Sequence, residues 1–402
     1  MTDVNGKRMW RRSPLKSSYE VVIIGAGVHG LATAYYLAKN HGITDVALLD
    51  KGYLGGGASG RNTAIVRSNY RTAEGVPFYQ ESVQLYEQLS GDLDFNVMFS
   101  QHGHLTLAHT DRGINSLRER AEMNQILGVN SRVIFPDEIQ GLVPAMALKT
   151  NPHYPVMAAL YHPPGGIIRH DAVVWGYARG CDRRGVQIHP FTTVTAINTS
   201  GGVVQSVSTN RGEITAKWVV NCTAGHASTI SRMVGVDMPI TTHPLQACVS
   251  EPLKPFLDPV IVSATLHIYV SQTDRGELVI GQEIDPYTSY SFRSTLPFLE
   301  GAAAHVLDLF PCLSEVRFLR QWAGICDMTP DYSPIMGETE VENFYLDAGW
   351  GTWGFKASAV CGETMAEMAA TRRVPDLIAP FRLSRFRDEE LVPEKAAASV
   401  SH

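Results

Sequence analysis

Two cationic residues far apart in the sequence are the side chains best suited to binding a small anionic ligand. Arg67 follows the short apolar segment 64–66, and Lys356 follows a run of glycines and tryptophans. A guanidinium binds a carboxylate through two parallel hydrogen bonds, and an ammonium adds a compact charge. Each residue is therefore either a solvated surface charge or one arm of a clamp for a substrate carboxylate.

A histidine beside an expected helix start is a candidate for covalent chemistry. His170 stands between Arg169 and Asp171, and Asp171 is a good N-cap for a helix over residues 172–184. The positive end of a helix dipole disfavours a protonated imidazole, and a neutral imidazole is the nucleophile that attachment to a cofactor carbon requires. From the residues alone, a capping or surface histidine is the favoured interpretation.

The stretch 19–50 contains the elements that would position a dinucleotide. An apolar run at residues 21–24 precedes the spacing G-x-G-x-x-G and a helical pattern, and a second apolar run at residues 46–49 ends on Asp50. This is the complete context of a βαβ unit that binds an adenine dinucleotide. Its glycines permit a tight turn, close approach to a pyrophosphate and close helix packing. They are Gly25, Gly27 and Gly30, and Asp50 is placed to accept hydrogen bonds from ribose hydroxyls.

Two further glycine-rich stretches favour FAD over a nicotinamide cofactor. The loop after Asp50 combines glycines with polar side chains that can wrap an extended ligand. Near the C-terminus, glycines again precede a helix, expected over residues 357–371, whose N-terminal amides would stabilise negative charge on a flavin ring. The candidate cofactor-binding residues in these stretches are Lys51, Ser59, Arg61, Asn62, Thr63, Gly351, Thr352 and Gly354.

Composition and charge exclude several classes of protein. The chain has 402 residues, 44% hydrophobic and 18% charged, which is ordinary for two or three globular domains. Its net charge of −6 provides no field for nucleic acid, no apolar run reaches the length of a membrane span, and the six cysteines lack metal or disulfide spacing. We therefore expect a cytoplasmic protein with no metal site, no nucleic-acid partner and no membrane contact.

A basic arm over residues 1–18 is the exception in charge. It is either a solvated tail or a docking arm for a partner subunit, because a tryptophan has little reason to lie in a disordered segment. The residues concerned are Lys7, Arg8, Arg11, Arg12 and Lys16 around Trp10.

Periodicity along the rest of the chain predicts two domains. Helices are expected over residues 74–90, 111–127 (with Asp111 as N-cap) and 297–310, with a short one after Pro136; strands are expected over 98–109 and within 186–224 and 238–292. The fold class is α/β: a Rossmann-like FAD-binding domain with a second, mainly antiparallel α+β substrate domain. The first would comprise residues 19–97, 160–228 and 325–386, and the second residues 98–159 and 229–324.

These stretches together resemble one group of enzymes. Over residues 9–386 the chain is similar to the amine-oxidising flavoenzymes of the D-amino-acid-oxidase and sarcosine-oxidase group, and most of all to the β subunits of heterotetrameric sarcosine oxidases. The resemblance is carried by residues 29–39, 51–57, 61–63, 67–70, 99–101, 169–172, 243–247 and 349–352.

The resemblance implies a role for each candidate residue. FAD would bind non-covalently between the glycines and the loop. His170 matches the attachment point of a second flavin, FMN, held between this subunit and a larger α-type partner, with small subunits expected in the same heterotetramer. Arg67 and Lys356 match the pair that binds the substrate carboxylate, and Tyr269 falls near a substrate-site tyrosine.

The sequence departs from that group at three places. Monomeric relatives attach FAD to a cysteine and place a lysine beside the flavin for oxygen activation. Cys326 is slightly out of step with that cysteine, and the strand expected to carry the lysine reads Leu-Val-Ile at residues 278–280. Trp353 stands where sarcosine-specific subunits carry glycine. These differences argue against oxygen chemistry at the FAD and for a different preferred amine.

The implied reaction is oxidation of a secondary amino acid, sarcosine or a similar N-methyl amino acid, by hydride transfer to FAD. Electrons would pass to FMN and then to oxygen or another acceptor, and the family's partner subunit captures the one-carbon unit on tetrahydrofolate. One alternative is a related dehydrogenase for N-methylglutamate, proline or another secondary amine that uses an acceptor other than oxygen. A second is a non-catalytic flavin-binding scaffold, against which the presence of both Arg67 and Lys356 counts.

Overall fold

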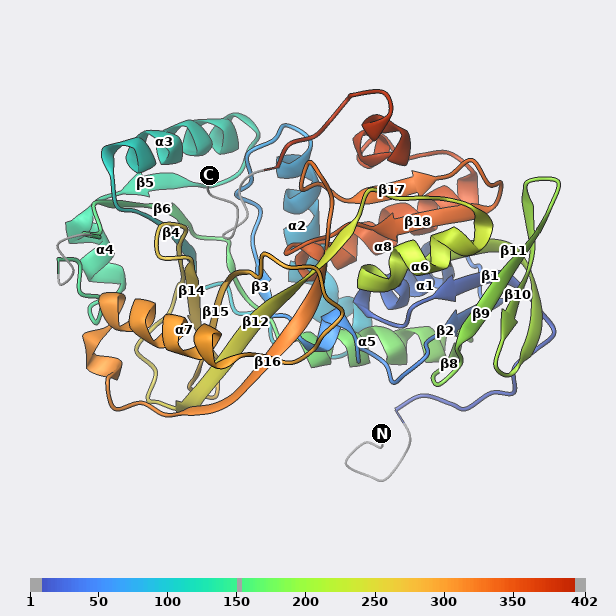
Figure 1. Cartoon of the computed structure of the whole chain (residues 1–402), viewed down its shortest axis with the longest axis horizontal. Coiled ribbons are helices and arrows are strands. Elements are labelled where there is room, and N and C mark those ends of the chain that lie inside the picture. Colours follow the sequence, from blue (N-terminus) through green and yellow to red (C-terminus); the bar gives the residue numbers. More distant parts are fainter. Residues whose placement is uncertain (1–8, 150–153, 395–402) are drawn as a thin grey trace.

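The computed structural model describes residues 9–149 and 154–394, which form two sheets with helices around them (Figure 1). The first sheet is parallel along most of its width, with an antiparallel edge strand β17 and a β9–β10 hairpin that pairs with β11. In spatial order its strands are β17 (Ile335–Glu338), β18 (Phe344–Ala348), β11 (Gly212–Asn221), β1 (Ser18–Ile24), β2 (Val46–Leu49) and β8 (Gln187–His189), with β10 (Val203–Thr209) and β9 (Val194–Ser200) beside β11.

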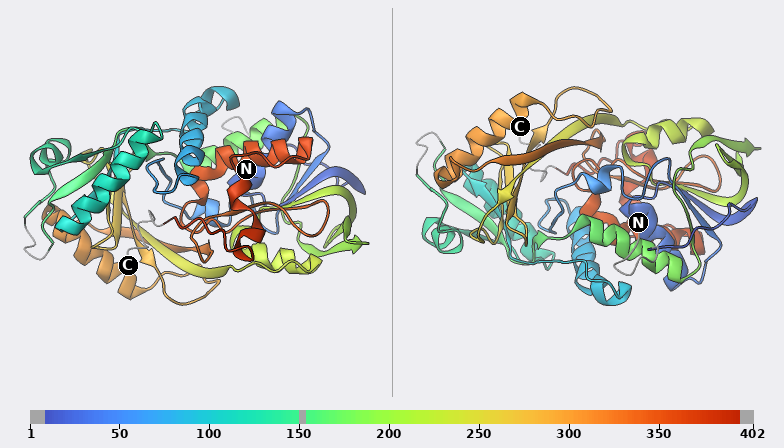
Figure 2. Two further views of the ribbon diagram at one scale, coloured as in Figure 1. Left: turned by 90° about the horizontal axis from the view of Figure 1, so that it is seen from above. Right: turned by 90° about the horizontal axis from the view of Figure 1, so that it is seen from below.

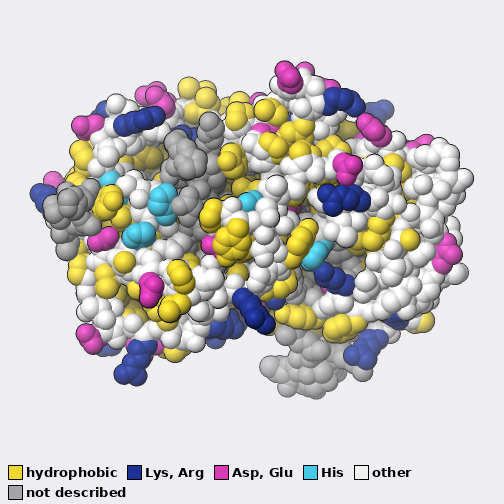
Figure 3. All heavy atoms as spheres, in the orientation of Figure 1, with side chains coloured by type: hydrophobic (Ala, Val, Ile, Leu, Met, Phe, Trp, Pro, Cys, Tyr) yellow, Lys and Arg dark blue, Asp and Glu magenta, His cyan; other side chains and the backbone are white. Residues whose placement is uncertain are grey.

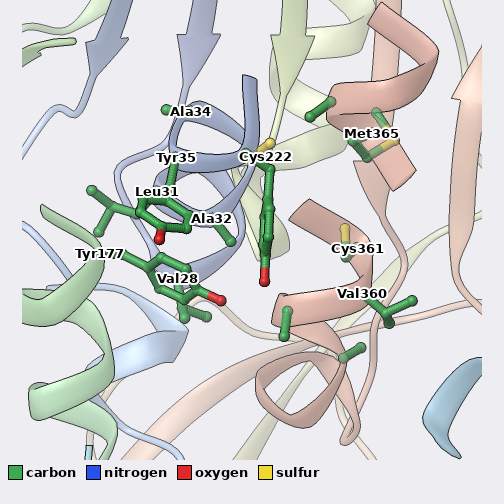
Figure 4. Close-up of a cluster of buried hydrophobic side chains, with 14 of the residues drawn as sticks. Val28, Leu31, Ala32, Ala34, Tyr35, Tyr177, Cys222, Val360, Cys361 and Met365 are labelled. Carbon is green, nitrogen blue, oxygen red and sulfur yellow. The ribbon is translucent and has the colours of Figure 1, made fainter. Parts of the chain in front are cut away.

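Helix α1 (Val28–Asn40) is the centre of the core beside this sheet. Its buried side chains include Leu31 and Tyr35, and Tyr35 packs against Tyr177 of α5 (His170–Arg183), with ring centroids 5.5 Å apart, in a core that also contains Val360 of α8 (Gly354–Thr371) (Figure 4). A Cβ on Gly362 would lie 2.4 Å from the Cβ of Ala32, so glycine is what lets α8 approach α1 this closely. Helix α2 (Gly75–Leu93) packs against α8 in the same core.

The second sheet is antiparallel except where β13 and β4 run parallel. Its strands in order are β16 (Phe318–Met328), β12 (Thr241–Pro252), β15 (Glu277–Ile284), β14 (Ile268–Gln272), β13 (Val260–Ser263), β4 (His104–Ala108), β6 (Ala158–His162) and β5 (Arg132–Ile134). A separate two-stranded pair joins β3 (Ile65–Val66) to β7 (Gly166–Ile167).

Helices cover both faces of this second sheet (Figure 2). Helix α7 (Leu296–Leu309) packs on one face in a core shared with α4 (Pro136–Leu142), and α3 (Asp111–Ile126) packs on the other. The short elements are α6 (Ala227–Ser231) and the 3₁₀ turns η1 (Ala58–Gly60), η2 (Ala224–His226), η3 (Arg232–Val234), η4 (Pro311–Leu313), η5 (Ala379–Phe381) and η6 (Leu383–Phe386).

The expected fold class, a Rossmann-like α/β unit beside a mainly antiparallel α+β unit, is confirmed. Three local predictions are wrong. The N-cap of α3 is Thr110, whose side chain accepts a hydrogen bond from the amide of Gly113, and α5 is preceded by Arg169, so that Asp171 lies inside its first turn. Strand β4 begins only at His104, because the left-handed backbone of Met98 and Gly103 interrupts extended structure before it.

Helix α8 begins at Gly354, three residues earlier than expected, so Lys356 lies in its first turn. The described part of the N-terminal arm docks on its own chain: Trp10 packs against the core around α1, and Arg11 pairs with Asp182 of α5 at 3.0 Å. Lys7 and Arg8 lie outside the described residues.

Charged groups of both signs are interspersed over the face of the molecule shown in Figure 3, without a large patch of one sign. Within the described residues, no helix has both the length and the apolar character needed to cross a bilayer.

Candidate active site

A cavity of about 490 Å³ lies at the carboxyl ends of β1, β2 and β18. The starts of two helices contribute to its wall, α1 through Gly27 and α8 through Gly354. Ligands in open parallel sheets bind at this edge, where helix N-termini offer amide donors. The two glycine runs, far apart in the sequence, therefore meet at one cavity.

The glycines of the first turn are required by close backbone contacts. Gly25 has a φ of +108°, and a Cβ there would lie 2.4 Å from the carbonyl oxygen of Cys222. A Cβ on Gly30 would lie 2.0 Å from the carbonyl oxygen of Gly25. Any side chain at these two positions would push β1, β11 and α1 apart.

Asp50 and Ser59 orient the loops that line the cavity. The Asp50 carboxylate accepts hydrogen bonds from the amides of Ala26 at 2.9 Å and Gly52 at 2.7 Å. Ser59 Oγ accepts from the amide of Val28, the first residue of α1, at 2.9 Å. Both side chains thus hold the backbone around the G-x-G-x-x-G turn, and both line the cavity.

The remaining candidates of the loop also line this cavity. Lys51 Nζ lies 2.9 Å from His226 Nε2, and the Arg61 guanidinium lies over the ring of Phe292, 4.0 Å from its centroid. Arg61 also donates to the carbonyls of Gly56 and Gly57, which closes the glycine-rich loop on itself. The others on the cavity wall are Asn62, Thr63, Gly351 and Thr352.

The residues around the cavity fit a dinucleotide such as FAD. Gly27, the N-cap of α1, has no side chain to cap the helix, and Trp353, which precedes α8, makes no side-chain cap either. Apart from the Val28 amide, which Ser59 binds, the two helices thus begin at the cavity without a side-chain cap from the N-cap residue. This is the arrangement that receives a pyrophosphate or another anion.

A second cavity, of about 430 Å³, adjoins the first. The two share part of their lining, including Thr63, Tyr269, Thr352 and Phe355. Arg67 and Lys356 line the second cavity. The sequence candidates for binding a nucleotide and for binding a carboxylate thus fall in neighbouring cavities with a common border.

Arg67 is held in place at the end of β3. Its side chain is buried, one guanidinium nitrogen donates to Asn69 Oδ1 at 2.9 Å, and the guanidinium carbon lies 4.4 Å from the ring centroid of Tyr70. Burial, together with the positive charge of Arg67, lowers the pKa of the Lys356 ammonium well below its ordinary value. A bound carboxylate would pair with both cations, and would so offset both the burial of the ammonium and its repulsion by Arg67.

Tyr269 lies at the border of the two cavities. It is buried on β14, and burial raises the pKa of its phenol. A Cβ on Gly281 of the neighbouring strand would lie 2.0 Å from the phenolic oxygen, so the ring lies flat against a strand that has no side chain there. Gly281 thereby fixes the position of the tyrosine.

The sequence analysis missed several side chains of the second cavity. Arg71, His104, Arg112 and Arg120 line it together with Trp353, which had been noted only as a departure. They come from the segment after β3, from β4 and from α3, and no motif or spacing joins them before the chain folds.

His170 is the first residue of α5, is partly buried and lies outside both cavities. Burial lowers the pKa of its imidazole, although the neighbouring Asp171 carboxylate opposes this shift. The Asp171 carboxylate pairs with Arg169 at 2.7 Å. The neutral imidazole that covalent attachment requires is thus favoured, at a position separate from the two adjoining cavities.

A partly buried histidine joins the two helix starts. His29 Nδ1 lies 3.0 Å from the Asp347 carboxylate, and Nε2 lies 2.7 Å from the carbonyl oxygen of Gly354. Burial alone would lower the pKa of His29, but the Asp347 carboxylate and the Gly354 carbonyl outweigh it and raise the pKa. Both ring nitrogens face acceptors, an arrangement that favours the protonated ring.

The residues at which the sequence differs from the group that it resembles lie in different parts of the structure. Cys326 lines the first cavity with its thiol buried, and Leu278 and Ile280 are buried in the core under α7, away from both cavities. Trp353 is buried against Tyr70, with ring centroids 5.3 Å apart, and lines the second cavity.

Comparisons with known proteins identify relatives over the whole length of the chain. The family described as FAD dependent oxidoreductase matches residues 20–368. The sarcosine oxidase subunit beta of Rhodobacter capsulatus is 44% identical over 98% of this chain and 95% of the relative, and that of an Arthrobacter species is 43% identical over 98% and 97%. A crystal structure of L-proline dehydrogenase from P. horikoshii has a TM-score of 0.88 and 27% identity, covering 94% of this chain and all of that one.

Proposed function

Because this chain belongs to the FAD-dependent oxidoreductase family, and within it to the sarcosine oxidase β subunits, we propose that it oxidises a secondary amino acid such as sarcosine or a similar N-methyl amino acid. FAD, bound non-covalently in the larger cavity, supplies the acceptor for the hydride from the carbon next to the nitrogen. The residues of this chain bind the substrate, orient it and control its protonation.

Arg67 and Lys356 bind the substrate carboxylate, which positions the neighbouring carbon and nitrogen toward the border of the two cavities. The cationic surroundings also disfavour a protonated amine, and a neutral nitrogen is the form that can be oxidised. Tyr269 and Thr63, which both cavities share, mark the place where substrate and cofactor would meet. Buried Trp353 limits the space for the substituent on the nitrogen.

One observation carries this proposal. Two cations from β3 and α8 line a cavity that shares its border with the cavity of the G-x-G-x-x-G turn. A scaffold subunit has no need of a lysine in a cavity wall whose pKa is lowered by burial and by a neighbouring arginine.

Electrons then pass, in this proposal, to an FMN attached at His170 between this subunit and a larger α-type partner, and from there to oxygen. The location of His170 outside both cavities supports a separate second site. The name of the relatives, subunit beta, supports an assembly with other subunits.

Six free cysteines suit the reducing cytoplasm, where we place the protein.

A related dehydrogenase that uses another acceptor is the second candidate. The similarity to an L-proline dehydrogenase favours it.

Anaerobic mixing of the flavin-loaded protein with sarcosine, proline and N-methylglutamate tests catalysis. Bleaching of the flavin band by one of these amines supports amine oxidation, and no bleaching by any of them supports the scaffold. Repeating the reaction with oxygen or an artificial acceptor separates an oxidase from a dehydrogenase.

A further inference from the structure

The outer part of the substrate cavity carries more positive charge than one carboxylate requires. Arg71, Arg112 and Arg120 line the cavity in addition to Arg67 and Lys356, and no aspartate or glutamate is found in the lining within the described residues. Like charges around one cavity repel one another unless an anion lies between them. The charge distribution therefore calls for a ligand with more than one negative group.

One face of α3 forms the outer wall of the cavity. Arg112, Ser116 and Arg120 are spaced four residues apart, so they lie on the same side of the helix. Arg71, from the segment after β3, donates a hydrogen bond to Ser116 Oγ at 2.8 Å. Arg71 and Arg112 are exposed at this end, whereas Arg120 is buried behind them.

Among the described residues, the arginines at the outer end of the cavity have mainly neutral hydrogen-bond partners. Arg120 donates to the backbone carbonyl of Asn69, and Arg71 to a hydroxyl, which are neutral acceptors. Glu394 supplies one carboxylate nearby, and it accepts from the amides of Arg71 and Thr72. Arg112 makes no ion pair in the part of the chain that the structure describes. Within the described residues, the side chains of Arg71 and Arg112 at the outer end of the cavity therefore form no ion pair with a carboxylate.

Two buried donors in the same wall also lack partners. His104, on β4, is 1% exposed, and neither of its ring nitrogens has a hydrogen-bond partner. The indole nitrogen of Trp353 is likewise buried without a partner. Burial, with Arg67 and Arg120 nearby, lowers the pKa of His104, so that its neutral ring keeps one N–H donor. Unpaired buried donors cost free energy, which an acceptor-rich ligand would recover.

We propose that the preferred substrate is a secondary amino acid with a second carboxylate, of the N-methyl amino dicarboxylate class. Its first carboxylate lies between Arg67 and Lys356, and its second is bound by Arg71 and Arg112 at the outer end of the cavity. This inference rests on the proposed function and narrows it to a substrate class.

The test compares two substrates of equal size that differ in one charge. The flavin-loaded protein, with the subunits that copurify, is mixed anaerobically with N-methyl-L-glutamate, N-methyl-L-glutamine or sarcosine, and the rate of flavin bleaching is followed against concentration. N-methylglutamate should reach half of its maximal rate at a concentration about tenfold lower than N-methylglutamine, as one charged hydrogen bond predicts. The difference should shrink as salt is added.

Two variants on the same helix make the assignment specific. Arg112→Gln should bring the ratio of the half-saturating concentrations of N-methylglutamine and N-methylglutamate close to one. Arg118→Gln should keep the wild-type ratio, because Arg118 is exposed outside the cavity lining and donates to Asn115.

Equal half-saturating concentrations for the two substrates, or a ratio that Arg112→Gln leaves intact, would overturn the inference. If sarcosine bleaches the flavin without any preference for the dicarboxylate, only this inference fails. If no amine bleaches it, the proposed function fails as well.

Discussion

His29 Nδ1 lies 3.0 Å from the buried carboxylate of Asp347, a contact that ties the start of α1 to the end of β18. The other ring nitrogen binds the carbonyl of Gly354, the first residue of α8. One side chain thus connects the two helix starts that face the nucleotide cavity, and it also places Lys356, in the first turn of α8, relative to the G-x-G-x-x-G turn.

His29→Gln should lower the free energy of unfolding by about 3 kcal/mol at pH 6, since it leaves the Asp347 charge buried without its partner. Because the pKa of His29 is raised in the folded protein, its contribution is complete below its ordinary value of 6.5 and is lost as the pH rises through the raised value. Urea unfolding at pH 6 and pH 9 measures this. The exposed His102→Gln is the control, and an equal loss at both pH values would contradict the account.

Arg67→Gln and Lys356→Met should each lower kcat/KM for a secondary amino acid about 10- to 100-fold, since each removes a charged hydrogen bond of about 1.5–3 kcal/mol. Steady-state rates with the amino acid and with an amine that lacks a carboxylate distinguish binding from a general defect. The surface variant Lys39→Met, which breaks the pair with Asp92, should change neither rate. A similar loss with the amine lacking a carboxylate would count against a carboxylate clamp.

Gly281→Ala should displace the Tyr269 ring, because the added Cβ would lie 2.0 Å from the phenolic oxygen. We expect a loss of stability of about 1–3 kcal/mol and a higher KM. Gly91→Ala, within α2 and with no atom within 4 Å of the added Cβ, should instead gain up to about 1 kcal/mol. Thermal unfolding and initial rates report both effects; an unchanged KM in Gly281→Ala would show that Tyr269 has no part in substrate binding.

The sequence predicted what depends on local patterns and missed what depends on folding. The turn at Gly25 and the strand ending at Asp50 are recognisable because a βαβ unit imposes its spacing within one stretch. His104 and Arg120 could not be assigned to a site, because β4 meets α3 and the segment after β3 only in the folded chain. The N-cap of α3 was misassigned because Thr110 and Asp111 are both good caps, and only the geometry decides between them.

Asp50→Asn should weaken FAD binding about tenfold. The two carboxylate oxygens of Asp50 accept from the amides of Ala26 and Gly52, one each, and the side-chain nitrogen of asparagine cannot accept the second of these hydrogen bonds. Titration of the deflavinated protein with FAD, followed by flavin fluorescence, gives the dissociation constant. Asp45→Asn, which removes an exposed partner of Lys16, is the matched control. Equal dissociation constants for FAD in the two variants would show that Asp50 does not contribute to cofactor binding.

His170→Ala should abolish any covalently attached flavin while leaving dissociable FAD in place, because His170 lies outside the nucleotide cavity. Acid precipitation of the native complex separates attached flavin from dissociable flavin, and His102→Ala should behave as wild type. Attached flavin that persists in His170→Ala would refute the assignment.

In the proposed site, Arg67 and Lys356 hold a substrate carboxylate beside FAD. A crystal structure of the flavin-loaded protein with a non-oxidisable carboxylate, such as methoxyacetate, tests it most directly. The carboxylate should lie within hydrogen-bonding distance of both cations, with the rest of the ligand against the flavin ring near Tyr269. A carboxylate bound elsewhere, or FAD outside the cavity around Gly27 and Gly354, would contradict it.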